Sequence, residues 1–194
     1  GLDHWEVDTL SLARNDVTLA QPGFRLFVTN TATIGPEARL TLGRPLEVPE
    51  TRFTAASLAL TNGGTLELYS GEGDAQGFGA RLSVSNTLTI GADSELIPVA
   101  HSYDGGIVRC TMKNLAVAAG GAVNADVRGY AYNHGPGTAT KSYTGAGYGG
   151  RGGVRTPRGD QLGGEGQPYG SVSQPRDPGS GGLSISYGRA YGGG

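Results

Sequence analysis

The amino-acid sequence predicts an all-β protein, a right-handed parallel β-helix (β-solenoid) whose C-terminal part is rich in glycine and dominated by loops. Three observations predict this fold: a near copy of one ten-residue segment, an apolar unit that recurs at solenoid spacing, and apolar residues that alternate with polar ones. Alternation is the period of a half-buried β-strand, and the frequent Thr, Val and Ile in these segments favour strands as well. The pattern covers residues 5–128.

The near copy is the clearest sign of a repeat architecture. Residues 26–35 (LFVTNTATIG) and residues 82–91 (LSVSNTLTIG) match at seven positions without an insertion. Segments related in this way run in the same direction in a solenoid. The strands of an all-β sandwich, the alternative that also has short strands at regular spacing, pair in antiparallel hairpins instead. The copy therefore favours the solenoid over the sandwich.

A looser unit extends the repeat along residues 32–125. Each unit has two apolar positions separated by one residue, a linker of five residues, and a second such pair. The four units are Ala32/Ile34 with Leu40/Leu42, Leu58/Leu60 with Leu66/Leu68, Leu88/Ile90 with Leu96/Pro98, and Leu115/Val117 with Val123/Ala125. Their spacing along the chain falls in the range typical of solenoid coils, and their linkers contain glycines that favour turns. Two short strands and a tight turn therefore form one coil, and stacked coils share one core.

No segment predicts a helix or a membrane span. The best helical candidate, residues 116–125, has Gly120 and Gly121 at its centre, and each costs about 1 kcal/mol relative to Ala. The longest apolar runs, such as residues 96–100 and 116–119, are far shorter than the roughly 20 residues of a spanning helix.

The composition changes at Gly129, which we take as a domain boundary between residues 1–128 and residues 129–194. Of the 36 glycines, 21 fall in the second part. So many glycines are typical of a flexible linker, but the tyrosines interspersed among them argue against one, because disordered linkers are poor in aromatic residues. These tyrosines include Tyr130, Tyr132, Tyr143, Tyr148, Tyr169 and Tyr187. We expect a Gly/Tyr-rich excursion that is ordered and packs on the solenoid or continues it.

A resemblance to a known group of proteins follows from these segments. The ladder of Leu-x-Val-x-Asn units followed by Gly-Ala-Gly-Tyr-Gly-Gly-Arg-Gly-Gly (residues 145–153) resembles large Gly-rich parallel β-helix surface proteins of bacteria. These are similar in architecture to autotransporter passengers and filamentous adhesins. The resemblance covers nearly the whole chain. It implies an extracellular or cell-surface location, and a chain that is processed or is a piece of a longer one with more coils beyond Gly194.

Candidate catalytic groups are few. The least implausible cluster is His101, Asp104 and Arg109, and its simpler interpretation is a solvated loop between coils. The other histidines, His4 and His134, lie far from it in sequence. Cys110, the single cysteine, sits among apolar residues, which favours a small buried hydrophobe over a nucleophile. The sequence holds no P-loop, dinucleotide fingerprint or Ser/His/Asp elbow. We therefore predict no catalytic residue, no cofactor site and no enzyme.

Metal and nucleic-acid motifs are weak. The loop of residues 71–77 (GEGDAQG) and the pair Asp93 and Glu95 offer carboxylates for weak Ca²⁺ binding, but neither matches a β-roll calcium repeat, so we predict no metal site. Arg151-Gly-Gly resembles a single RNA-binding RGG unit, and Arg158-Gly-Asp160 an integrin tripeptide that arises easily by chance. A net charge of −2 with scattered basic residues is not that of a duplex binder, so we expect no nucleic-acid partner.

The expected function is structural. We predict an extracellular β-solenoid module that is a self-associating fibre subunit, or an adhesive or spacer segment of a large surface protein. Its partners would be further copies stacked head to tail, adjacent coils of a longer chain, or surface glycans, because the open edges of end coils favour pairing. The alternative is a carbohydrate-active β-helix enzyme or a polysaccharide-binding module, which needs a groove with carboxylates about 5–10 Å apart.

Overall fold

The structure is a computed structural model that describes residues 3–45, 50–141, 144–153, 164–171, 173 and 176–182. The chain forms two compact units. One comprises Gly1–Val99 with Gly106–Asn124, and the other Ala100–Gly105 with Ala125–Gly194. The predicted boundary at Gly129 lies within the second unit. Secondary structure in the described ranges consists of strands, with no helix long and apolar enough to cross a membrane.

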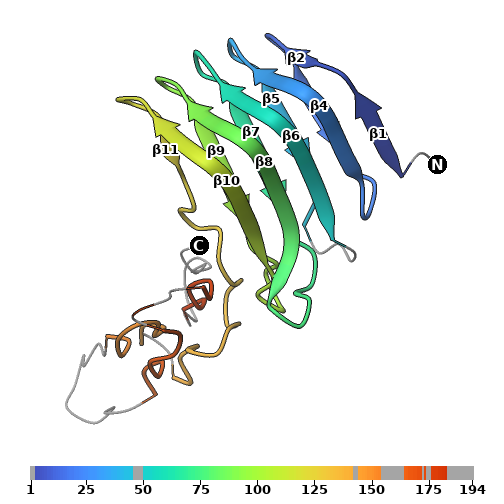
Figure 1. The fold of residues 1–194 in the computed structure, drawn as a ribbon. Helices are drawn as coiled ribbons and strands as arrows, with labels where there is room; N and C mark the ends of the chain where they lie inside the picture. The colour runs from blue at the N-terminus through green and yellow to red at the C-terminus, as the bar shows by residue number, and fades with distance from the viewer. Residues whose placement is uncertain are drawn as a thin grey trace. The chain divides into compact units, whose positions relative to one another are not determined.

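The first unit is a β-solenoid of about four turns, built from two parallel sheets (Figure 1). Each coil contributes one stretch of chain to each sheet. The first sheet contains β1 (His4–Val7), β2 (Leu10–Leu12), β4 (Arg25–Ile34), β6 (Thr51–Leu60), β8 (Phe78–Ile90) and β10 (Ile107–Val117). The second contains β3 (Asp16–Leu19), β5 (Arg39–Leu42), β7 (Thr65–Tyr69), β9 (Glu95–Val99) and β11 (Ala122–Val123). The predicted all-β parallel solenoid is confirmed, whereas its right-handed sense stays a prediction.

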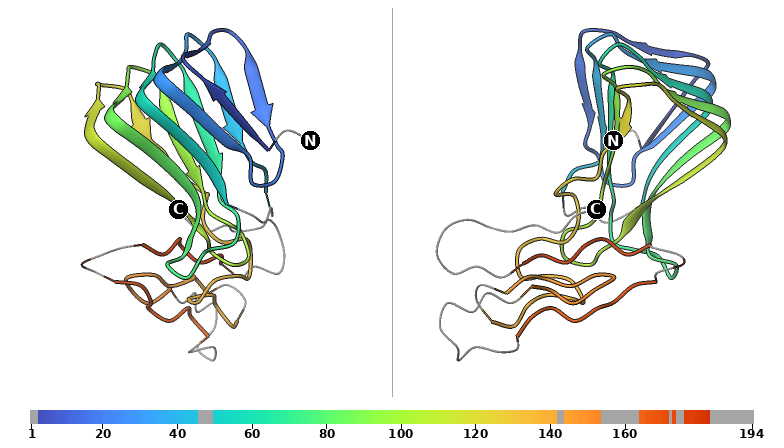
Figure 2. Two further views of the ribbon diagram at one scale, coloured as in Figure 1. Left: turned by 45° about the vertical axis from the view of Figure 1, so that its right-hand side comes forward. Right: turned by 90° about the vertical axis from the view of Figure 1, so that its left-hand side faces the viewer.

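The strand register reproduces the predicted stacking. The leading apolar positions of the four units pair from coil to coil, and so do the trailing ones. The resulting columns are Ala32–Leu58–Leu88–Leu115, Ile34–Leu60–Ile90–Val117, Leu40–Leu66–Leu96–Val123 and Leu42–Leu68–Pro98. Most of these side chains are fully buried, and burying each Leu or Ile contributes about 1.5–3 kcal/mol. The right-hand view of Figure 2 shows successive coils lying behind one another.

The corner between the two sheets repeats a backbone conformation. The third residue after the first sheet's strand has a positive φ in four coils, at Glu37, Gly63, Asp93 and Gly120. Successive corners are hydrogen-bonded: the Glu37 N–H donates to the Asn62 carbonyl (3.0 Å) and the Asp93 N–H to the Gly120 carbonyl (3.2 Å). The corners therefore stack in register like the strands.

The structure contains one coil that the repeat pattern missed. Leu10 and Leu12 pair with Ala32 and Ile34, and β3 pairs with β5 in the same way. The linker from Leu12 to the next apolar residue of the coil is one residue shorter than in the other units. A fixed spacing rule therefore passes over this coil, although the corner hydrogen bond from the Arg14 N–H to the Pro36 carbonyl (2.8 Å) keeps it in the stack.

Two residue-level expectations were wrong. Cys110 pairs with the buried Leu82 but is itself exposed, because β10 is the last strand of its sheet and no further coil of the described chain covers it. Ala125, expected in the last apolar pair, lies outside β11, which ends at Val123. Both errors come from reading an end coil as an internal one.

The second unit is built from extended segments and turns that approach one another backbone to backbone. The Gly152 N–H donates to the Gly166 carbonyl, and the Gly166 N–H to the Gly145 carbonyl, both at 3.0 Å. A Cβ atom on Gly152 would lie 1.8 Å from the Gly145 carbonyl oxygen, so no larger residue fits there. Close packing of chains around glycine follows the same steric rule as in collagen. Tyr143 and Tyr187 lie outside the described residues.

Candidate functional site

The outward face of the first sheet carries a column of basic side chains, here called the arginine ladder. Each of β1, β4, β6, β8 and β10 contributes one residue to it. The members of the ladder, in paired order from coil to coil, are His4, Arg25, Arg52, Arg81 and Arg109. These residues directly precede a second set that also pairs from coil to coil, Trp5, Leu26, Phe53, Leu82 and Cys110. Paired strands lie about 4.8 Å apart, so the ladder repeats a basic group at that spacing along the coil axis.

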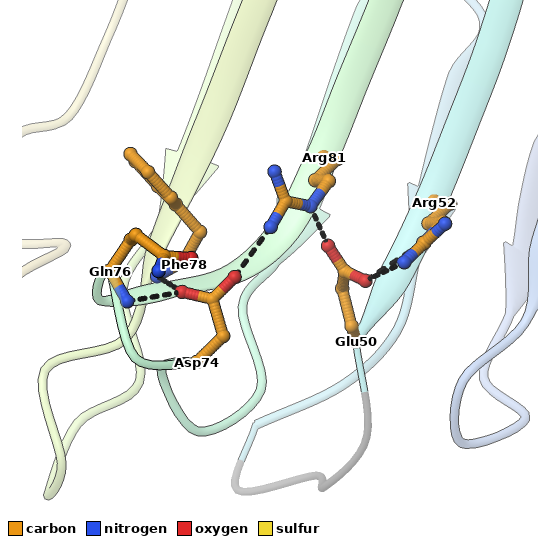
Figure 3. Close-up of polar contacts among 6 residues, drawn as sticks. All are labelled: Glu50, Arg52, Asp74, Gln76, Phe78 and Arg81. Carbon is orange, nitrogen blue, oxygen red and sulfur yellow. Dashed lines mark hydrogen bonds and ion pairs between the residues drawn. The ribbon is translucent and has the colours of Figure 1, made fainter.

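Two carboxylates bind the middle of the ladder (Figure 3). Glu50 accepts hydrogen bonds from the Arg52 Nε (2.8 Å) and from the Arg81 Nε, and so bridges neighbouring coils. Asp74 pairs with the other side of the same Arg81 guanidinium. Charge-assisted hydrogen bonds of this kind are stronger than neutral ones, although their partial exposure to water limits their net contribution.

Asp74 is held by its own loop as well. Its Oδ1 accepts the backbone N–H groups of Phe78 (3.0 Å) and Gln76 (2.8 Å), as Figure 3 shows. The Phe78 N–H, together with the Gln76 N–H and the Arg81 guanidinium, lowers the pKa of Asp74 below its ordinary value. Asp74 is therefore ionised at neutral pH and has no proton to supply as a general acid.

The ladder continues through an aromatic contact. The Phe78 ring lies close to two guanidinium groups, with its centroid 5.6 Å from the Arg81 Cζ and 5.1 Å from the Arg109 Cζ. Both distances are within the range of cation–π attraction. Arg109, expected beside His101, thus belongs to the ladder on β10. The network orders cationic side chains along one face, an arrangement suited to binding anions rather than to proton transfer.

His101 and Asp104 do come together in the second unit. The buried His101 Nδ1 accepts the Asp104 backbone N–H (3.0 Å) and lies 3.2 Å from the Asp104 carboxylate. Tyr103 contacts two histidine rings edge to face, His134 with centroids 4.4 Å apart and His101 at 6.5 Å. Because His101 and His134 lie far apart in the sequence, their shared aromatic neighbour was not foreseen.

The weak metal motifs acquire ordinary structural contacts. Asp74 binds Arg81 and its own loop, and the Glu95 Oε1 accepts a hydrogen bond from the Asn124 amide (3.3 Å). Within the described ranges, no three His, Cys, Asp or Glu side chains gather as metal ligands would. In the Gly-rich part, Arg151 pairs with Glu165 (3.1 Å). The Arg158–Asp160 tripeptide lies outside the described residues.

The function proposed below is argued from the fold and the arginine ladder, because comparison with known proteins found no match. No protein-family model, curated protein or solved structure matches the chain. The ladder itself was missed by the sequence analysis. A signal for it existed, since each arginine directly precedes an apolar residue or Cys110 in its strand, at similar though unequal intervals along the chain.

Proposed function

We propose that this chain is an extracellular structural module, a rigid β-solenoid that acts as a spacer or fibre element of a surface assembly. The observation that carries the proposal is the continuous core, in which the same apolar positions stack through every coil. Such a core makes each coil depend on its neighbours, which gives a stiff rod whose length grows with the number of coils. The resemblance to β-helix surface proteins supports the extracellular location.

The fold also suits association through its ends. Among the described strands, β1, β2, β3, β10 and β11 each pair on one edge only. An unpaired edge offers backbone N–H and C=O groups to another chain. A fibre element would use these edges to add coils, whether from another copy or from neighbouring sequence.

Electron microscopy of the purified full chain, across a range of concentrations, tests the proposal. We expect rods or fibres whose axial repeat is a multiple of the coil spacing of about 4.8 Å. Leu60→Asp, which puts a charge into the fully buried core, should abolish them. Compact particles without an axial repeat at every concentration would contradict a fibre or spacer role.

The arginine ladder favours a second candidate, the binding of an acidic polysaccharide along the coil axis. Carboxylate or sulfate groups along a glycan would meet the repeated guanidinium groups of the ladder. Binding should be stronger for acidic than for neutral polysaccharides. It should also weaken as the salt concentration rises from about 0.01 M to about 1 M, because salt screens the attraction between exposed charges.

Single substitutions separate ladder binding from general charge attraction. Arg25→Ala and Arg109→Ala remove ladder positions outside the Glu50 bridge. Arg14→Ala removes the same charge at a corner and serves as the matched control. Equal losses for all three variants, or equal binding of neutral and acidic glycans, would count against a ladder site.

A further inference from the structure

The two ends of the solenoid expose different strands. At one end, β10 and β11 leave Leu115, Val117 and Val123 about half exposed (52%, 47% and 51%), although these residues continue the core columns. At the other end, Trp5 is 40% exposed, and residues of β1 line an open pocket. Each end therefore presents an apolar strip with an unpaired strand edge, the kind of surface that a further coil covers.

The first sheet's end strands, β10 at one end and β1 with β2 at the other, have the same residue spacing. Each ladder and core position of β10 has a counterpart in β1 or β2, and one constant difference in residue number relates every pair. The equivalent pairs are Arg109 with His4, Cys110 with Trp5, Met112 with Val7, Leu115 with Leu10, and Val117 with Leu12.

Neighbouring coils inside the chain do not share this equal spacing, although β6, with Ala55 and Leu58, has the same spacing of three as the end strands. Between neighbouring coils inside the chain, the spacing of the inward residues alternates between three and four, as in Val84 to Leu88 against Met112 to Leu115. The pairings of β4 with β6, β6 with β8, and β8 with β10 therefore each contain at least one register shift. The end strands would pair from His4 to Leu12 without a shift.

The charges of the two ends are complementary. The strands β10 and β11 carry Arg109 and Lys113 and no acidic residue, whereas β1 and the turn after it carry Glu6 and Asp8. In the equal-spacing register, Glu6 of one copy lies opposite Thr111 of the other, with Arg109 and Lys113 two residues away on either side. Diagonal neighbours at that separation are within reach of long side chains.

We infer that a second copy of this chain is the partner of the β10 edge, and that it docks its β1 and β2 there in parallel, in the register that places His4 beside Arg109. This inference rests on the proposed function, since it specifies how a fibre element joins its neighbour. The contact is head to tail, so repetition generates an open filament rather than a closed dimer. The arginine ladder then runs without interruption from copy to copy through His4.

Charge exchange in the full chain tests this register. Glu6→Lys and Lys113→Glu each place like charges across the contact and should weaken association at least tenfold in sedimentation velocity. The double variant Glu6→Lys/Lys113→Glu restores opposite charges and should recover most of the association. Glu72→Lys, the same change in an exposed loop outside β1, β2, β10 and β11, is the control and should associate normally.

A second variant tests the apolar part of the contact. Leu115→Lys places a charge in the exposed core column of β10 and should abolish association. Circular dichroism checks that each variant keeps its β-structure. If neither Leu115→Lys nor the charge exchange changes the strength of association, the docking inference is overturned and the chain associates through another surface. A chain that stays monomeric at millimolar concentration would also overturn it, whereas the spacer role would fail only if microscopy shows no rod.

Discussion

In four coils, the third residue after the first sheet's strand adopts a left-handed backbone conformation that is sterically unfavourable for most side chains. Two coils place glycine there, at Gly63 and Gly120, and two place Glu37 and Asp93. A non-glycine residue in this region costs about 1–2 kcal/mol, less for Asp than for Glu. The corners thus perform the same turn with different amounts of strain.

Glu37→Gly should therefore stabilise the solenoid. Relief of the left-handed strain exceeds the added entropy of glycine in the unfolded chain, and we expect a net gain of about 0.5–1 kcal/mol in the free energy of unfolding. Urea titration followed by circular dichroism measures it. Gly63→Ala is the reciprocal control: its φ of +81° should make it destabilising although its Cβ has room. A loss of stability in Glu37→Gly would contradict this account of the corner.

Cys110 provides a pH-dependent test at the same scale. Desolvation by its surroundings raises the pKa of the Cys110 thiol from 9.0 to about 11, although the residue is exposed. The folded chain holds this proton more tightly than the unfolded chain, so stability should fall as the pH rises from about 9 to 11. Iodoacetamide should modify the folded protein at pH 8 at least tenfold more slowly than the urea-unfolded protein. Equal rates would show that the thiol is not perturbed.

The strands of the first unit and the Gly-rich segments of the second unit are held in place by different kinds of contact. The strands bury side chains in columns, whereas segments of the second unit bring backbone to backbone at glycines. A column tolerates many apolar residues. A backbone contact with a carbonyl oxygen 1.8 Å from the Cβ position at Gly152 tolerates none but glycine.

Gly152→Ala should consequently destabilise the second unit, by about 1–3 kcal/mol as for other overpacked sites. Gly149→Ala is the matched control, since a Cβ there meets nothing within 4 Å. Amide hydrogen exchange of residues 145–153 and 164–170 measures the difference. Similar protection in the two variants would mean that the Gly-rich segments do not pack as described.

At the scale of the whole molecule, stability resides in interfaces between neighbouring coils. The first sheet follows the order β1-β4-β6-β8-β10, so each coil contacts only the coils before and after it. In such an array, coils can be removed without loss of the fold if the register is kept.

Deletion of residues 36–91 is expected to leave a shorter folded solenoid. It joins Gly35 to Ala92, and the near copy ensures that the chain continues as it does after Gly91. The urea m-value should fall, because less surface is exposed on unfolding. Deletion of residues 36–77 is the control: it joins β4 directly to β8 without a strand for the second sheet and should not fold. Loss of β-structure in the first variant would contradict a modular stack.

The arginine ladder and the Glu50 bridge between its coils were not predicted from the sequence. The arginines recur at unequal intervals, so their column becomes visible only when the coils are aligned by strand pairing. Glu50 and Arg81 lie far apart in the sequence, and the length of the intervening loops decides their contact. The exposure of Cys110 likewise depends on its place in an end coil.

The amino-acid sequence by itself determined the period of the strands, the register of the core columns and the parallel stacking, because alternation and coil length decide which side chains can be buried together. Tertiary structure alone decided which polar side chains meet on the outside, which corner residues are strained, and which columns end at an open edge. Those features depend on loops of variable length and on the number of coils, neither of which a hydrophobic pattern encodes.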